Sequence, residues 1–143
     1  MKCLIGAALL PLVVGLLTGA TQPTTVPTYV IQKPTIIAFF PPTTDAELEK
    51  NPDLNEVLGD FQLYAYQAGP RLKKAGINFE VASAIIFRVK NGGVVHTFKT
   101  GKVGVGYYFV APGKQPNVEY GVHDDLDILE IARKYFQLQI AAP

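Results

Sequence analysis

Cysteine is almost missing from this chain: among 143 residues the only one is Cys3. It precedes the apolar run at the N-terminus, so it leaves with that run if the segment is cleaved as a secretory signal. The remaining chain then has no thiol. This excludes disulfides, thiolate nucleophiles, thiol redox chemistry and cysteine-ligated metal sites, and leaves packing alone to stabilise the fold.

An excess of charge of one sign is also lacking. The chain has 13 Lys+Arg and 12 Asp+Glu, and without Lys2 it has 12 of each. A chain with no basic excess is a poor candidate for binding phosphates or an anionic surface. We therefore expect no nucleic-acid partner, and no stable membrane insertion once the N-terminal segment is removed.

The N-terminus has the three parts of a signal peptide. Lys2 supplies a positive charge, an apolar run covers residues 4–17, and small residues lead up to Ala20. A retained membrane anchor is the alternative, but spanning a bilayer takes about 20 apolar residues, and this run has 14 with Pro11 inside it. We expect cleavage after Ala20 and a periplasmic or secreted location.

Two segments are expected after the signal peptide of residues 1–20. Residues 21–33 (TQPTTVPTYVIQK) are rich in threonine and proline, which favours an extended, solvated tether. Residues 34–143 have the usual size of a single domain. Within it, the apolar run of residues 34–40 predicts a strand covered on both faces, and hence a central one.

Two helices are expected next. The pattern Thr44-x-x-Glu47 is a capping box that predicts a short helix, which Asn51-Pro52 would end. A second capping pattern, Asp53-x-x-Glu56, predicts the start of the main helix, and apolar residues then recur at three- and four-residue steps. Gly69-Pro70 should end or kink it, since proline lacks the N–H and clashes with the preceding turn. Gly76 is the predicted stop.

The period then changes to two, which predicts strands over residues 77–81 and 85–90. Asn91-Gly92 is a hairpin turn signal leading to a returning strand over residues 94–99, with a short helix in residues 85–99 as the alternative. A last hairpin is predicted from residues 105–110 and 118–122. A final helix, capped by Asp124, follows it. This order predicts an α/β or α+β fold in which helices pack on a central mixed β-sheet.

The C-terminal part, residues 103–136, resembles the closing β-hairpin and last helix of the thioredoxin family. The opening strand TIIAFF and the helix after it resemble the family's first half. The resemblance implies a thioredoxin-like sandwich with a central mixed sheet, a closing β-hairpin and a C-terminal helix. Two segments depart from it: residues 85–99 lie where the family has a helix, and residues 43–52 look inserted.

The family's redox residues do not carry over. Where the family has Cys-x-x-Cys at a helix start, this chain reads Pro41-Pro42-Thr43-Thr44-Asp45. In the slot of the family's cis-proline it has Gly106. The resemblance therefore implies a redox-inactive version of the fold, for which we predict no catalytic residue, no metal and no cofactor.

His123, beside Asp124 and Asp125, is the strongest alternative for chemistry. The three could serve a small hydrolase or a metal-dependent enzyme, although metal sites usually need three or four ligands with a supporting shell. Helix capping accounts for the aspartates equally well. Ser83, the only serine, lacks the glycine elbow of a serine hydrolase.

The tyrosines could form a partner-binding patch, because each side chain combines an apolar ring with a hydroxyl that can contact water. Tyr107, Tyr108 and Tyr120 fall on the last hairpin, and Tyr64 and Tyr66 on the main helix. Packing in the core is the commoner role of such residues.

The leading hypothesis is an exported, non-catalytic domain that binds a protein or peptide partner in the cell envelope. A purely structural or immunity-type envelope protein is a further alternative. The predicted binding residues are the replaced redox positions and their neighbours: Pro41, Pro42, Thr43, Gly104, Val105, Gly106 and Tyr107.

Overall fold

The computed structural model describes residues 25–101 and 104–137. The predicted signal peptide and the first residues of the predicted tether lie outside them. The elements in chain order are β1 (Thr28–Ile31), β2 (Thr35–Phe40), α2 (Asp45–Lys50), α3 (Pro52–Lys74), β3 (Asn78–Ser83), β4 (Ile86–Asn91), β5 (Val94–Lys99), β6 (Gly106–Val110), β7 (Asn117–Tyr120) and α4 (Asp125–Phe136). Within the described ranges, no helix is long and apolar enough to cross a membrane.

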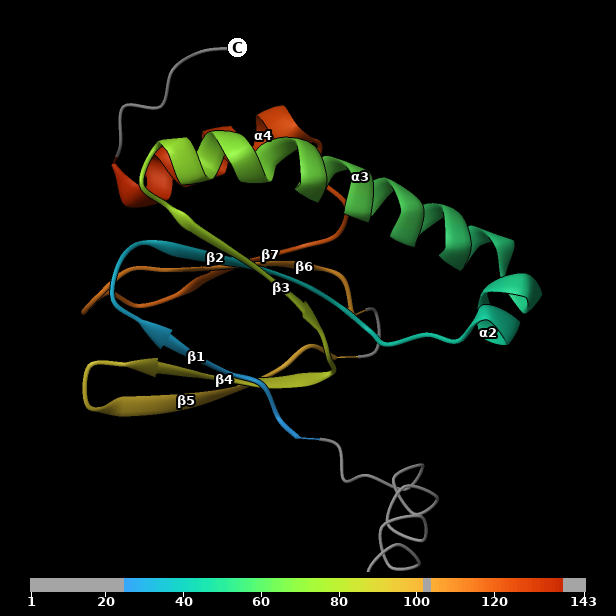
Figure 1. Ribbon diagram of the computed structural model, residues 1–143, viewed down its shortest axis with the longest axis horizontal. Helices are drawn as coiled ribbons and strands as arrows, with labels where there is room; N and C mark the ends of the chain where they lie inside the picture. The colour runs from blue at the N-terminus through green and yellow to red at the C-terminus, as the bar shows by residue number, and fades with distance from the viewer. Residues whose placement is uncertain (1–24, 102–103, 138–143) are drawn as a thin grey trace, which may run out of the picture.

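The elements form three layers (Figure 1). A four-stranded sheet in the order β3-β2-β6-β7 lies in the middle, with α3 and α4 on one face. A three-stranded sheet in the order β1-β4-β5 packs on the other face. Each sheet is mixed: β2 pairs parallel with β3 and antiparallel with β6, and β4 pairs parallel with β1 and antiparallel with β5. The mixed α/β class is confirmed, with two sheets rather than one.

Strand β2 is central, as its unbroken apolar sequence predicted. It lies between β3 and β6, and its side chains alternate between two cores. Ile36 and Ala38 pack with the helices, whereas Ile37 and Phe39 pack with the three-stranded sheet. The absence of a polar face in TIIAFF is thus explained by apolar neighbours on both sides.

The capping box before α2 forms as predicted. Thr44 N donates to Glu47 Oε2 at 2.7 Å, and Glu47 N donates to Thr44 Oγ1 at 3.3 Å. The bond from Thr44 N and a second one from the Thr44 hydroxyl, at 3.0 Å, lower the pKa of the Glu47 carboxyl. Helix α3 begins one residue before the predicted Asp53, because Asn51 is the cap that accepts from Leu54 N, at 3.1 Å.

Pro70 does not end α3, which continues to Lys74 before Gly76 takes a positive φ of 83°. The helix face on either side of Pro70 is buried: Gly69 lies against the Phe79 ring and Leu72 is fully enclosed. This packing outweighs the one helical hydrogen bond that proline removes. The predicted stop at Gly76 is confirmed.

Residues 85–99 form a hairpin, not a helix. Gly92 and Gly93 make the turn between β4 and β5, with Gly92 at a φ of 64°. Phe87 and Val89 are buried while the residues between and after them are exposed, as the alternation predicted. The last hairpin and the final helix, with Asp124 as its cap, are also confirmed.

Strand β1 differs from the expectation of a solvated tether over residues 21–33. Thr28–Ile31 pairs parallel with β4, and Ile31 is buried between the two sheets. Only Tyr29 and Ile31 of its four residues carry the inward pattern, too short a run to register as a periodicity. The folded part of the chain therefore includes residues that precede the predicted domain start at Pro34.

Candidate functional site

The two predicted binding segments meet in space. Gly104 has a φ of 72°, and a Cβ added there would lie 2.8 Å from Pro41 Cδ. Gly106 lies in β6 opposite Phe39, where an added Cβ would be 2.5 Å from the Glu119 carbonyl oxygen. Glycine at these positions permits the close approach of neighbouring segments of the chain.

Most of the predicted residues are nevertheless buried. Gly104, Val105, Gly106 and Tyr107 belong to the core, Pro41 and Thr43 are half-buried, and Pro42 is exposed. A macromolecular partner can therefore reach only the proline end of the predicted site. The described residues contain no cis peptide bond, so Gly106 does not reproduce the geometry of the family's cis-proline.

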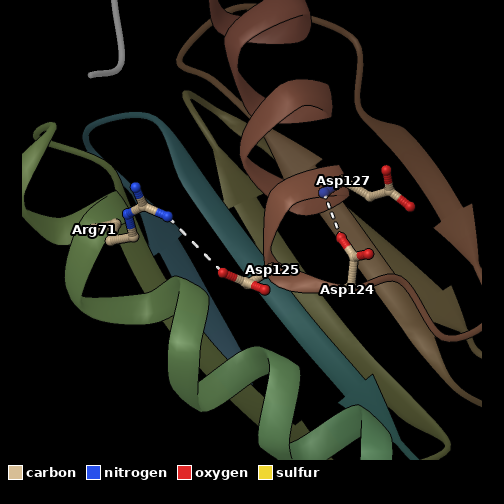
Figure 2. Close-up of polar contacts among 4 residues, drawn as sticks. All are labelled: Arg71, Asp124, Asp125 and Asp127. Atoms are coloured by element: carbon tan, nitrogen blue, oxygen red, sulfur yellow. Dashed lines mark hydrogen bonds and ion pairs between the residues drawn. The ribbon is translucent and has the colours of Figure 1, made fainter. Parts of the chain in front are cut away.

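The two aspartates of the enzyme alternative take part in a helix cap and an ion pair (Figure 2). Asp124 Oδ1 accepts from Asp127 N at 2.8 Å, and Asp125 lies 3.9 Å from the Arg71 guanidinium. The His123 ring contacts the Tyr120 carbonyl oxygen at 3.1 Å through Nε2. Among the described residues, no group of three or more His, Cys, Asp or Glu side chains could hold a metal.

A cavity between α3 and β3, which we call the α3–β3 groove, lies next to the predicted site. It has a volume of about 650 Å³, and one of its lining residues is Phe40, which directly precedes the predicted binding residue Pro41. Its lining is mainly apolar and aromatic. The lining residues are Phe40, Phe61, Gln62, Ala65, Tyr66, Gly69, Pro70, Lys73, Phe79 and Val81.

Two large side chains of the α3–β3 groove face solvent. Tyr66 is 80% exposed and Val81 is 54% exposed. Pro70 has no N–H to donate to the carbonyl of Tyr66, four residues earlier in the helix. Lys73 is the one charged residue of the lining. The groove thus combines apolar area with a few polar groups, as ligand sites commonly do.

The outer edge of β3 borders the same groove. In the described part of the chain β3 pairs with β2 alone. Asn78 N donates to the carbonyl oxygen of Pro34, just before β2, at 2.8 Å, and Ala84 N donates to that of Phe40 in β2 at 3.1 Å. Since successive N–H groups of a strand point to opposite edges, those of Phe79, Val81 and Ser83 point outward. The Val81 carbonyl oxygen has only a long contact, 3.5 Å from the Tyr29 hydroxyl.

Comparison with known protein families, with curated proteins and with solved structures finds no match to this chain. The groove itself could not be found from the sequence, because it needs the pairing of α3 with β3. Two signals pointed toward it: a tyrosine outside the apolar stripe of the helix, Tyr66, and the Gly69-Pro70 pair.

Tyr107, a predicted site residue, has an enclosed hydroxyl. Its oxygen has no hydrogen-bond partner among the described residues, and burial raises the pKa of the phenol above its ordinary value. An unpaired buried hydroxyl costs about 1–3 kcal/mol. We expect Tyr107→Phe to increase the free energy of unfolding by about 1 kcal/mol in urea denaturation.

The pH dependence provides a second measurement on the same variant. The folded state keeps the Tyr107 phenol protonated while the unfolded state releases the proton near the ordinary pKa of about 10. Stability therefore falls as the pH rises above about 10, and the fall should be shallower in Tyr107→Phe. A lower stability of the variant at neutral pH would instead show that the hydroxyl makes a favourable contact.

Proposed function

We propose that this protein is an exported, non-catalytic domain that binds an extended segment of a partner polypeptide in the α3–β3 groove. The observation that carries the proposal is the coincidence of an apolar groove with a free strand edge. The groove supplies contact area for side chains, and the outward groups of Phe79, Val81 and Ser83 supply main-chain partners.

The size and lining of the groove support a peptide as the occupant. Ligand cavities are typically about 300–1,000 Å³ and mostly apolar with a few polar groups. Addition of a strand to a free sheet edge is a common way to bind an extended peptide: main-chain bonds give affinity, and alternate side chains enter pockets. Here alternate side chains of the added strand would lie beside Val81 and Tyr66.

A redox-inactive thioredoxin-like fold is part of the proposal. The order of the four-stranded sheet supports it, with β2-α3-β3 followed by the β6–β7 hairpin and α4, and with both long helices on one face. The β4–β5 hairpin then replaces a helix of the family. The binding surface moves from the predicted binding residues to the groove beside them, since only Pro42 of those seven residues is exposed.

The test is selection of linear peptides from a random phage-displayed library on the purified protein. We expect enriched peptides with alternating apolar residues. Tyr66→Ala should weaken their binding about tenfold, because aromatic side chains at the centre of a contact commonly contribute more than 1 kcal/mol. Titration calorimetry with a synthetic copy of an enriched peptide measures this.

Leu63→Ala is the matched control. Leu63 lies on the same helix and is also exposed, but it does not line the groove. Its substitution should leave the affinity unchanged. N-methylation of the peptide at the residues that face β3 should abolish binding. Selected peptides that bind equally well to the Tyr66→Ala variant, or that tolerate N-methylation throughout, would place the site elsewhere.

A further inference from the structure

The outer face of the three-stranded sheet carries cations and no acidic residue. Strands β1, β4 and β5 contain no aspartate or glutamate. Their register aligns Thr28 with Arg88 and Thr97, and Val30 with Lys90 and Val95, in two neighbouring rows. These residues and Lys99, two residues beyond Thr97 on β5, are all exposed and form what we call the basic face.

The acidic residues lie in the other layers. Ten of the twelve belong to α2, α3 and α4 or to the cap of α4, and the other two, Glu80 and Glu119, lie in the four-stranded sheet. Within the described ranges, no ion pair joins Arg88, Lys90 or Lys99 to an acidic side chain. The balanced total charge of the chain thus conceals a separation of charge between the two outer layers.

The basic face has no hollow and has exposed apolar side chains. Neither described cavity is lined by its cations. Val30 and Val95 flank Lys90 and are 59% and 53% exposed. A sheet face with cations and two valines in neighbouring rows offers a broad contact area and no pocket for a small ligand.

We infer that the basic face binds the surface of a bilayer that contains anionic phospholipids. Arg88, Lys90 and Lys99 would contact the headgroups, and Val30 and Val95 would enter the interface, where apolar side chains leave water. The valines favour a bilayer over nucleic acid, because a polyphosphate chain has no apolar layer to receive them. Figure 1 shows α3 and the three-stranded sheet on opposite sides of the molecule, so a bound protein would keep its α3–β3 groove turned toward solvent.

The inference is tested by co-sedimentation with vesicles. The purified protein should bind vesicles of phosphatidylcholine mixed with phosphatidylglycerol, and bind less to phosphatidylcholine alone and at high salt. Each cation near an anionic surface contributes about fivefold to the partition coefficient. The double variant Arg88→Gln/Lys90→Gln should therefore bind about 30-fold more weakly, and Arg88→Glu/Lys90→Glu more weakly still.

Lys50→Glu/Lys74→Glu is the matched control for Arg88→Glu/Lys90→Glu, because the two double variants change the net charge equally and Lys50 and Lys74 are exposed residues of the helical layer. It should retain most of the binding. All variants carry the same N-terminal segment, so its contribution to binding is common to them. Equal losses in the control and the Arg88/Lys90 variants would overturn the inference. So would a preference for DNA or an acidic protein over the vesicles, or binding that does not depend on phosphatidylglycerol.

Discussion

Replacement of Phe39 by alanine is expected to lower the free energy of unfolding by about 4 kcal/mol. Phe39 is fully buried in the central strand and joins the two sheets. Its ring centroid lies 5.1 Å from that of Phe98, 6.0 Å from that of Phe87 and 5.9 Å from that of Tyr120. Alanine would leave a cavity bounded by β4, β5 and β7, where the three neighbouring rings lie. The strands are held by backbone hydrogen bonds and cannot move together to fill this cavity.

Urea denaturation followed by circular dichroism measures the loss. Val94→Ala is the control, since Val94 is an exposed residue of β5 whose substitution should cost less than about 0.5 kcal/mol. Hydrogen exchange should also show faster opening of β4 and β5 than of β2 in the Phe39 variant. A loss below that of the control would mean that the two sheets do not share the core described here.

Replacement of Gly106 by alanine is expected to cost about 3 kcal/mol. The new Cβ would lie 2.5 Å from the Glu119 carbonyl oxygen and 2.8 Å from Phe39 Cζ. The first of these neighbours is backbone, so the β6–β7 pairing must shift to make room. The phenylalanine ring is itself enclosed and cannot turn away.

Gly59→Ala is the opposite case and serves as the control. Gly59 is an exposed residue of α3 with no atom near the position of its missing Cβ. Alanine there should increase stability by about 0.5–1 kcal/mol, because glycine is a poor helix former. If Gly106→Ala were stabilised as well as Gly59→Ala, β6 and β7 could not pair as closely at Gly106 as the structure shows.

Much of the fold could be predicted from local patterns. The unbroken apolar run TIIAFF predicted the central strand, and the alternation around Phe87 with the Asn91-Gly92 turn predicted the β4–β5 hairpin. The caps of α2 and α4 were predicted from the Thr44-x-x-Glu47 pattern and from Asp124, because capping bonds form within three residues of the chain. Each of these features depends on neighbours in sequence.

What could not be predicted depends on residues distant in sequence. Strand β1 forms because β4 offers it an edge, and α3 continues through Pro70 because Gly69 and Leu72 face the sheet. The burial of the predicted site at Val105 and Tyr107 follows from the layer of helices above β6. The basic face likewise requires the pairing of β4 with β1 and β5, which brings Val30, Val95 and Lys99 to the side of the sheet that carries Arg88 and Lys90.

The central position of β2 has a consequence for how the protein folds. A chain is synthesised from its N-terminus, so β2 exists before either neighbour, and its pairing of Thr35 with Val110 must wait for β6. During this interval TIIAFF is an apolar strand with two open edges, which is a hazard for aggregation. Because β1 also waits for β4, folding is dominated by long-range pairing and is expected to take on the order of milliseconds to seconds. Completion of the fold therefore depends on the last third of the chain.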